Sequence, residues 1–158
     1  MMAIVVACAL LAQAPELIDR SLAIVSGRTI TLSDARTALA LGLIEGRALD
    51  ADVVRRLVDR ELMLREADRY APPEPPADQV DAGVARARQR AGGDEALARV
   101  LEAGGFTETT LRAWVRDDLR LAVYLQQRFA AAADRRAELI ADWVSDLRRR
   151  AQVVVLMP

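Results

Sequence analysis

Apolar residues recur at intervals of three and four along most of the chain after residue 50, which is the spacing of one face of an α-helix. The two widest apolar stripes run over residues 52–70 and 107–129, and they predict the two longest helices. Further helices are predicted from Ser33 and Asp34 onwards, over residues 77–91, over residues 94–103, and from Asp134 onwards.

Capping and helix-breaking residues mark the predicted helix ends. Ser33 and Thr107 each precede a helical stripe, where a hydroxyl can accept hydrogen bonds from the first N–H groups. Asp50 or Asp52 opens the helix that runs to about residue 70. The proline-rich run 72–76 (PPEPP) ends that helix, because proline lacks an N–H and disfavours helix in the preceding residue. This run is short, so it predicts a stiff elbow rather than a domain boundary.

Two short segments have the residue types of β-strands. Residues 22–25 (LAIV) are followed by a Ser26-Gly27 turn and by β-branched residues up to Thr31, a pattern typical of a hairpin. Residues 153–156 (VVVL) predict a strand at the end of the chain, which could add to that hairpin. The predicted fold is therefore mainly α, with about six helices and a small sheet of two or three strands.

Residues 1–14 predict a signal segment and export to the periplasm. An apolar run ends at Ala12-Gln13-Ala14, a small-residue pattern typical of a cleavage site. The run is too short for a membrane-spanning helix, which needs ~20 residues. Two alternatives remain: residues 5–8 (VVAC) are similar to a bacterial lipobox, which would place a lipid anchor on Cys8, or the segment is a buried N-terminal helix.

The rest of the chain, residues 15–158, is predicted to form a single helical domain, closed by a helix and a strand within residues 134–158. With 158 residues in total, 53% of them hydrophobic and 28% charged, the composition is that of a folded protein. The net charge of −1 argues against a dedicated nucleic-acid binder, which usually carries a basic surplus.

Two residue types are missing, and their absence narrows the possible chemistry. All 22 basic residues are arginine, so the chain has neither lysine nor histidine. This excludes Ser-His and Cys-His dyads, histidine metal ligands, a Schiff-base lysine and a phosphate-loop lysine. The single cysteine cannot form a disulfide within the chain.

No group of residues forms a recognisable catalytic constellation. The carboxylate pairs Asp117-Asp118 and Asp50/Asp52 are interpreted as solvated surface residues, and the arginines of residues 148–150 as a cluster at a helix end. The glycine pairs at 92–93 and 104–105 lack the context of a phosphate loop. We therefore expect no enzymatic activity, no metal site and no cofactor.

Three motifs in order resemble the N-terminal chaperone domain of SurA-type periplasmic proteins, the parvulin-associated family. Residues 23–34 (AIVSGRTITLSD) are similar to the family's entry pattern, with Ser26 in place of the usual asparagine. Residues 57–67 (LVDRELMLREA) resemble its L-I-x-x-x-L-L-x-x-E-A helix, and residues 97–129 its L-x-x-x-G-x-T-x-x-x-L-R segment. Together the motifs cover about residues 19–129.

The family often carries parvulin isomerase domains between the long helix and a closing helix and strand. In this chain only residues 130–133 separate those two helices, whereas a domain needs on the order of 100 residues. The resemblance implies a chaperone core without isomerase activity. Such a protein would bind unfolded or nascent envelope polypeptides without ATP.

A chaperone of this kind needs an exposed apolar groove between its helices. Four residues are candidate client contacts: Leu43, Met63, Phe106 and Trp114. The alternative for all four is packing in the core. At the level of function, the alternatives are a structural subunit of an envelope complex and a helical protein that binds nucleic acid through its arginines.

Overall fold

A computed structural model describes residues 19–156 of the chain. Within these residues the protein is mainly helical, with six α-helices and a three-stranded sheet, as the sequence predicts. The strands are β1 (Ser21–Val25), β2 (Arg28–Thr31) and β3 (Val153–Val155). The helices are α1 (Leu32–Ala40), α2 (Ala51–Asp68), α3 (Ala77–Ala91), α4 (Asp94–Ala103), α5 (Glu108–Arg128), the 3-10 helix η1 (Ala130–Arg135) and α6 (Arg136–Arg150).

The sheet joins the two ends of the described chain. Its order is β2-β1-β3, and both pairings are antiparallel, with Ile24 of β1 opposite Thr29 on one side and Val154 on the other. Ser26 and Gly27 make the hairpin turn with φ values of 46° and 90°, the positive values that match the twist of a two-residue hairpin. The early hairpin and the terminal strand therefore form one sheet, as predicted.

The observed helix caps correct two of the predicted boundaries. Thr31, not Ser33, caps α1, and it forms a capping box with Asp34 because both backbone N–H groups receive a side-chain acceptor. The last helix begins at Arg136 rather than at Asp134, because Ala132 leaves helical geometry and the preceding residues wind as a 3-10 turn. The predicted caps Asp50 of α2 and Thr107 of α5 are confirmed.

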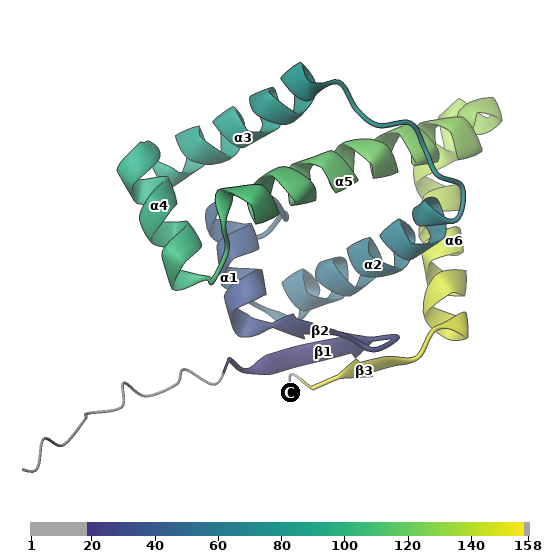
Figure 1. The fold of residues 1–158 in the computed structure, drawn as a ribbon. Coiled ribbons are helices and arrows are strands. Elements are labelled where there is room, and N and C mark those ends of the chain that lie inside the picture. The colour runs from purple at the N-terminus through teal and green to yellow at the C-terminus, as the bar shows by residue number, and fades with distance from the viewer. Residues whose placement is uncertain (1–18, 157–158) are drawn as a thin grey trace, which may run out of the picture.

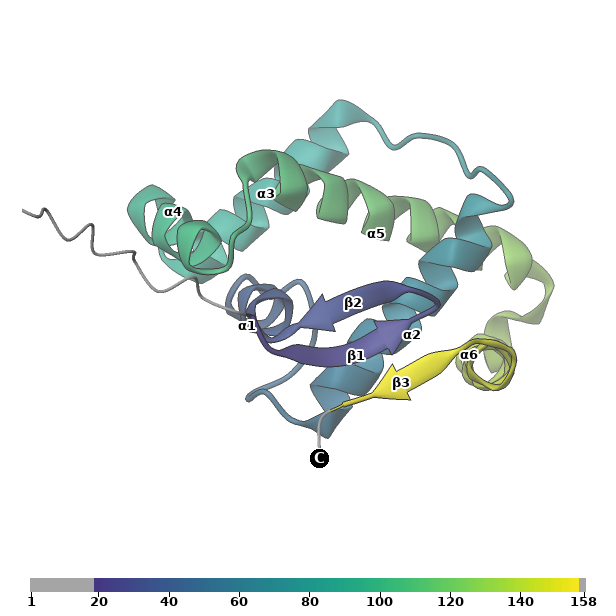
Figure 2. The same ribbon diagram turned by 60° about the horizontal axis from the view of Figure 1, so that its bottom comes forward.

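The helices surround the inner face of the sheet (Figures 1 and 2). α3 and α5 lie alongside each other, and α2 lies between α5 and the sheet, with contacts to β1, α5 and α6. The proline-rich elbow carries the chain from the end of α2 across to the start of α3. Gly83 allows α3 to approach α5 closely, since a Cβ at that position would lie 2.3 Å from Cγ1 of Val115.

One apolar core unites these elements. Its most deeply buried large side chains come from β1, α2 and α5: Leu22, Val25, Val53, Val54 and Leu111. None of the helices within residues 19–156 is long and apolar enough to cross a membrane. The predicted signal segment 1–14 and the candidate lipid site Cys8 lie outside the described residues.

Candidate binding site

A buried arginine fixes α2 against α5 beneath the candidate site. Arg60 of α2 is only 8% exposed, and its Nε donates to Oδ1 of Asp118 on α5 at 2.7 Å. Its Nη2 donates to the backbone carbonyl of Trp114 at 3.3 Å, and its guanidinium lies 3.8 Å from the centre of the Trp114 ring. Charge, hydrogen bonds and stacking on the ring therefore satisfy Arg60 together.

The environment of Asp118 shifts its protonation equilibrium. Burial raises the pKa of Asp118, because the charged carboxylate loses water, whereas the positive charge and hydrogen bond of Arg60 lower it. Burial is the larger of these effects, so the pKa lies above its ordinary value of 3.8. The ion pair thus connects α2 and α5, but the loss of water around its two charges offsets part of their attraction.

A groove opens beside this ion pair, between α2, α5 and the loop that follows α1. We call it the α2–α5 groove, and its volume is about 410 Å³. Its apolar lining consists of Leu43, Ile44, Met63, Leu121, Ala122 and Leu125. Its charged lining consists of Glu45, Arg56, Asp59, Arg60 and Asp118. The apolar lining can accept aliphatic or aromatic side chains while the exposed charges of Glu45 and Arg56 stay in water.

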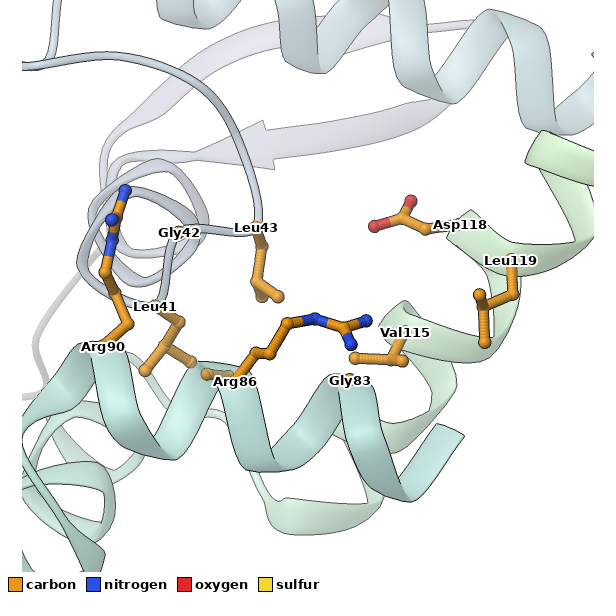
Figure 3. Close-up of a pocket in the computed structure, with 10 residues that line it drawn as sticks. Leu41, Gly42, Leu43, Gly83, Arg86, Arg90, Val115, Asp118 and Leu119 are labelled. Atoms are coloured by element: carbon orange, nitrogen blue, oxygen red, sulfur yellow. The ribbon is translucent and has the colours of Figure 1, made fainter. Parts of the chain in front are cut away.

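A second hollow of about 410 Å³ adjoins the groove, between α3, α5 and the same loop (Figure 3). We call it the α3–α5 pocket. It is more polar than the groove, because two arginines of α3, Arg86 and Arg90, line it together with Asp118. Leu43 and Asp118 line both hollows, so the two are neighbours along α5.

The structure divides the four candidate contacts into two pairs. Leu43 and Met63 are half-buried and both line the α2–α5 groove. Phe106 and Trp114 are each 9% exposed, lie in the core with their ring centres 6.1 Å apart, and line neither hollow. The structure thus brings two of the four residues together at the groove and places the other two beneath it.

Sequence reasoning did not select several of the lining residues. Ile44 lies in the irregular loop after α1, where no periodic pattern points to it. Ala122 and Leu125 belong to the apolar stripe of α5, and the sequence does not distinguish groove residues from core residues within that stripe. The spacing of Arg86 and Arg90 was the available signal for the pocket, because residues four apart share one face of a helix.

The side chains considered for chemistry have structural roles. Asp50 caps α2, Asp52 pairs with Arg55, and Asp117 pairs with Arg120, so the carboxylate pairs are engaged in capping and ion pairs. Among residues 19–156, no three His, Cys, Asp or Glu side chains stand close enough to hold a metal ion.

The arginine cluster at the end of α6 is also largely engaged. Arg148 binds both carboxylate oxygens of Asp59 on α2, and Arg149 pairs with Asp146 one turn earlier in α6. The first of these contacts attaches α6 to α2. Because two of the three arginines already have carboxylate partners, the cluster offers little free charge for a phosphate backbone.

The chain matches no protein-family model, and no curated protein is similar to it in sequence.

Proposed function

We propose that this protein is an ATP-independent, chaperone-like binder of unfolded exported polypeptides, without isomerase activity. The observation that carries the proposal is the α2–α5 groove, where Leu43 and Met63 stay half-exposed above a firmly packed core. The resemblance of residues 19–129 to the SurA-type chaperone domain supports the same function. Outer-membrane and other envelope proteins are the proposed clients.

The shape and chemistry of the groove fit an extended segment rather than a folded partner. Its volume of about 410 Å³ is in the range of small-ligand sites, which is enough for a few side chains. Its floor is aliphatic and includes a methionine, whose unbranched side chain adapts to different shapes. Binding would therefore tolerate many sequences, and folding of the client would compete with it and release it.

The proposal assigns binding alone to this chain. No lysine is present for a phosphate loop, and no histidine for the active site that the family's isomerase domain uses. A proline-peptide isomerisation assay tests this assignment. Catalysis that disappears when one defined residue is replaced would contradict it.

The central experiment separates groove residues from core residues. We expect Leu43→Ser with Met63→Ser to abolish suppression of client aggregation, while the melting temperature stays close to that of the unaltered protein. Leu156→Ser is the matched control, because Leu156 is 47% exposed and lies outside the groove. Full suppression by the folded double variant would contradict the proposal. Phe106→Ser should instead lower the melting temperature, because Phe106 is buried.

A second candidate function, a structural subunit of an envelope complex, is favoured by the edge of the sheet. Val154, Val155 and Leu156, in and just after the edge strand β3, are 52%, 56% and 47% exposed. A free strand edge with exposed apolar residues tends to pair with another chain. A pull-down that recovers one stoichiometric partner, together with no suppression of aggregation, would favour this function over the first.

Export to the periplasm is part of the proposal, and it rests on residues 1–14. Cell fractionation tests it directly, and cytoplasmic protein would contradict it. Membrane-associated protein that becomes soluble after Cys8→Ala would favour the lipid-anchored alternative.

A further inference from the structure

We propose that the α3–α5 pocket binds a carboxylate of the client, so that the preferred segment has an acidic group beside its apolar side chains. This inference rests on the proposed function and defines its substrate class. The apolar side chains would occupy the α2–α5 groove, and the acidic group would enter the neighbouring pocket, between Arg86 and Arg90.

The two arginines of the pocket differ from the other charged residues around α3. Arg88 of the same helix pairs with Asp94, and Asp81 pairs with Arg112 of α5. Within residues 19–156, by contrast, Arg86 and Arg90 form no ion pair with any carboxylate. They lie four residues apart, on the side of α3 that lines the pocket. Two exposed guanidinium groups on one wall are thus available to an anion.

Arg90 packs against Gly42 at the other end of the pocket. A Cβ at Gly42 would lie 2.9 Å from Nε and 3.4 Å from Cγ of Arg90, so the arginine side chain passes directly over the glycine. The φ of Gly42 is +65°, a value that side chains other than glycine rarely adopt. Any larger residue would displace Arg90 and strain the loop that also carries Leu43.

Asp118 is the acidic residue among the residues that line the pocket, and it is already engaged. Its carboxylate accepts the 2.7 Å hydrogen bond from Arg60, so much of its charge is compensated from the groove side. Figure 3 shows Arg86 extending from α3 towards the Asp118 side of the pocket, and Arg90 on the side of Gly42. Arg60 already compensates Asp118, so the positive charges of Arg86 and Arg90 in the pocket leave room for a second negative charge.

The walls of the pocket determine what can carry that charge. Leu41, Val115 and Leu119 supply aliphatic surface beside the two arginines, which suits a carboxylate attached to a carbon chain better than a small hydrated ion. Leu43 lies between groove and pocket, so a single extended segment can reach both. Such a carboxylate can be the side chain of Asp or Glu, or the C-terminus of the polypeptide.

The test uses the full chain and fluorescein-labelled peptides, with binding followed by fluorescence anisotropy. Four peptides share one apolar sequence: one ends in a free carboxylate, one in an amide, one is amidated with an internal Glu, and one is amidated with Gln at that position. We expect the acidic peptides to bind about twofold to fivefold more tightly than their neutral partners, the range for exposed ion pairs. The C-terminal and the internal pair distinguish the two sources of carboxylate.

The variant Arg86→Gln with Arg90→Gln should abolish this preference and leave binding of the neutral peptides unchanged. Arg99→Gln is the matched control, because Arg99 is an arginine of α4 with a 71% exposed side chain that lines neither hollow. Higher salt should reduce the preference in the unaltered protein.

The outcomes separate this inference from the proposed function. If acidic and neutral peptides bind with equal affinity, the carboxylate site is contradicted, and the proposed chaperone function still stands because all peptides bind. A preference that persists in the Arg86 and Arg90 double variant would also overturn the site. Absence of binding for all four peptides would contradict the proposed function itself.

Discussion

The pair Phe106 and Trp114 and the pair Leu43 and Met63 are both apolar but lie in different environments. The aromatic pair is buried, and Arg60 covers the Trp114 ring at 3.8 Å. The aliphatic pair remains half-exposed and lines the α2–α5 groove. The first pair therefore belongs to the packed core, which we call the framework, and the second pair belongs to the binding surface that the framework supports. The difference indicates that the groove forms where the packing of the helices leaves apolar side chains partly exposed.

Arg60 separates the two environments. It lines the groove with Met63, but it turns its guanidinium onto Trp114 and Asp118 on the α5 side. The indole is thereby covered, while the neighbouring methionine is left open. Stability should consequently depend on the aromatic pair and on Arg60, and client binding on Leu43 and Met63.

The largest effect on stability is expected from the buried aromatic pair. Trp114→Ala should lower the free energy of unfolding by about 3–5 kcal/mol, because it leaves a cavity and removes the surface on which Arg60 stacks. Denaturation by urea measures the change. A loss below about 1 kcal/mol would show that Trp114 does not belong to the framework.

A smaller loss is expected when the link between α2 and α5 is removed. Arg60→Ala should cost about 1.5–3 kcal/mol, the usual range for a hydrogen bond to a charged group. The Asp118 side chain is 37% exposed, so water can replace part of the lost contact. Urea denaturation of Arg99→Ala serves as the control, and an equal loss in both variants would contradict the structural role of Arg60.

The loop that carries Leu43 should be sensitive at its glycine. Gly42→Ala is expected to lower the free energy of unfolding by about 1–3 kcal/mol, because φ is +65° at this position. We expect a value towards the lower end of that range because the position lies in a loop. It should also weaken the preference for acidic peptides, because the new Cβ meets Arg90. Gly93→Ala is the control with a positive φ but with open space around its Cβ position. Loss of the acidic preference in both variants would contradict the role of Gly42.

Met63→Ser should have a smaller effect on stability than any of these replacements. The side chain is half-buried at the groove, so a loss of less than about 1 kcal/mol is expected in urea denaturation, together with weaker peptide binding. A loss equal to that of Trp114→Ala would place Met63 in the framework and remove the distinction between the two pairs.

The smallest effect concerns pH and distinguishes two carboxylates. Burial raises the pKa of Asp118, so its contribution to stability is present below its ordinary value of 3.8 and is lost as pH rises through the raised value. For Asp19, burial raises the pKa, but the hydrogen bonds from Thr31 and Ser33 outweigh the effect of burial, so the pKa lies below its ordinary value. Its contribution is therefore present above 3.8 and is lost as pH falls through the lowered value.

Paired denaturation curves measure both contributions. Asp118→Asn should change the slope of stability against pH only above 3.8, and Asp19→Asn only below it. Slope changes in the same pH window for the two variants would contradict the opposite environments of these carboxylates.

The sequence by itself determined the local structure of this protein. Helical spacing of apolar residues, the caps Asp50 and Thr107, and the prolines after α2 each act within a few neighbouring residues, so they can be read without a fold. Where two nearby residues can both cap a helix, the local pattern does not decide between them. Thr31 caps α1 in place of Ser33, because its hydroxyl and the Asp34 carboxylate satisfy each other's backbone N–H groups.

Only the tertiary structure decided which apolar residues are covered and which stay open. Arg60 and Asp118 are 58 positions apart, so no local pattern indicates that they meet, or that Trp114 is buried beneath them. The same holds for the α3–α5 pocket, where Arg86 of α3 faces a loop more than forty positions earlier in the chain. Periodicity identifies the apolar face of each helix, but the width of the groove depends on how closely two helices approach, which long-range contacts alone determine.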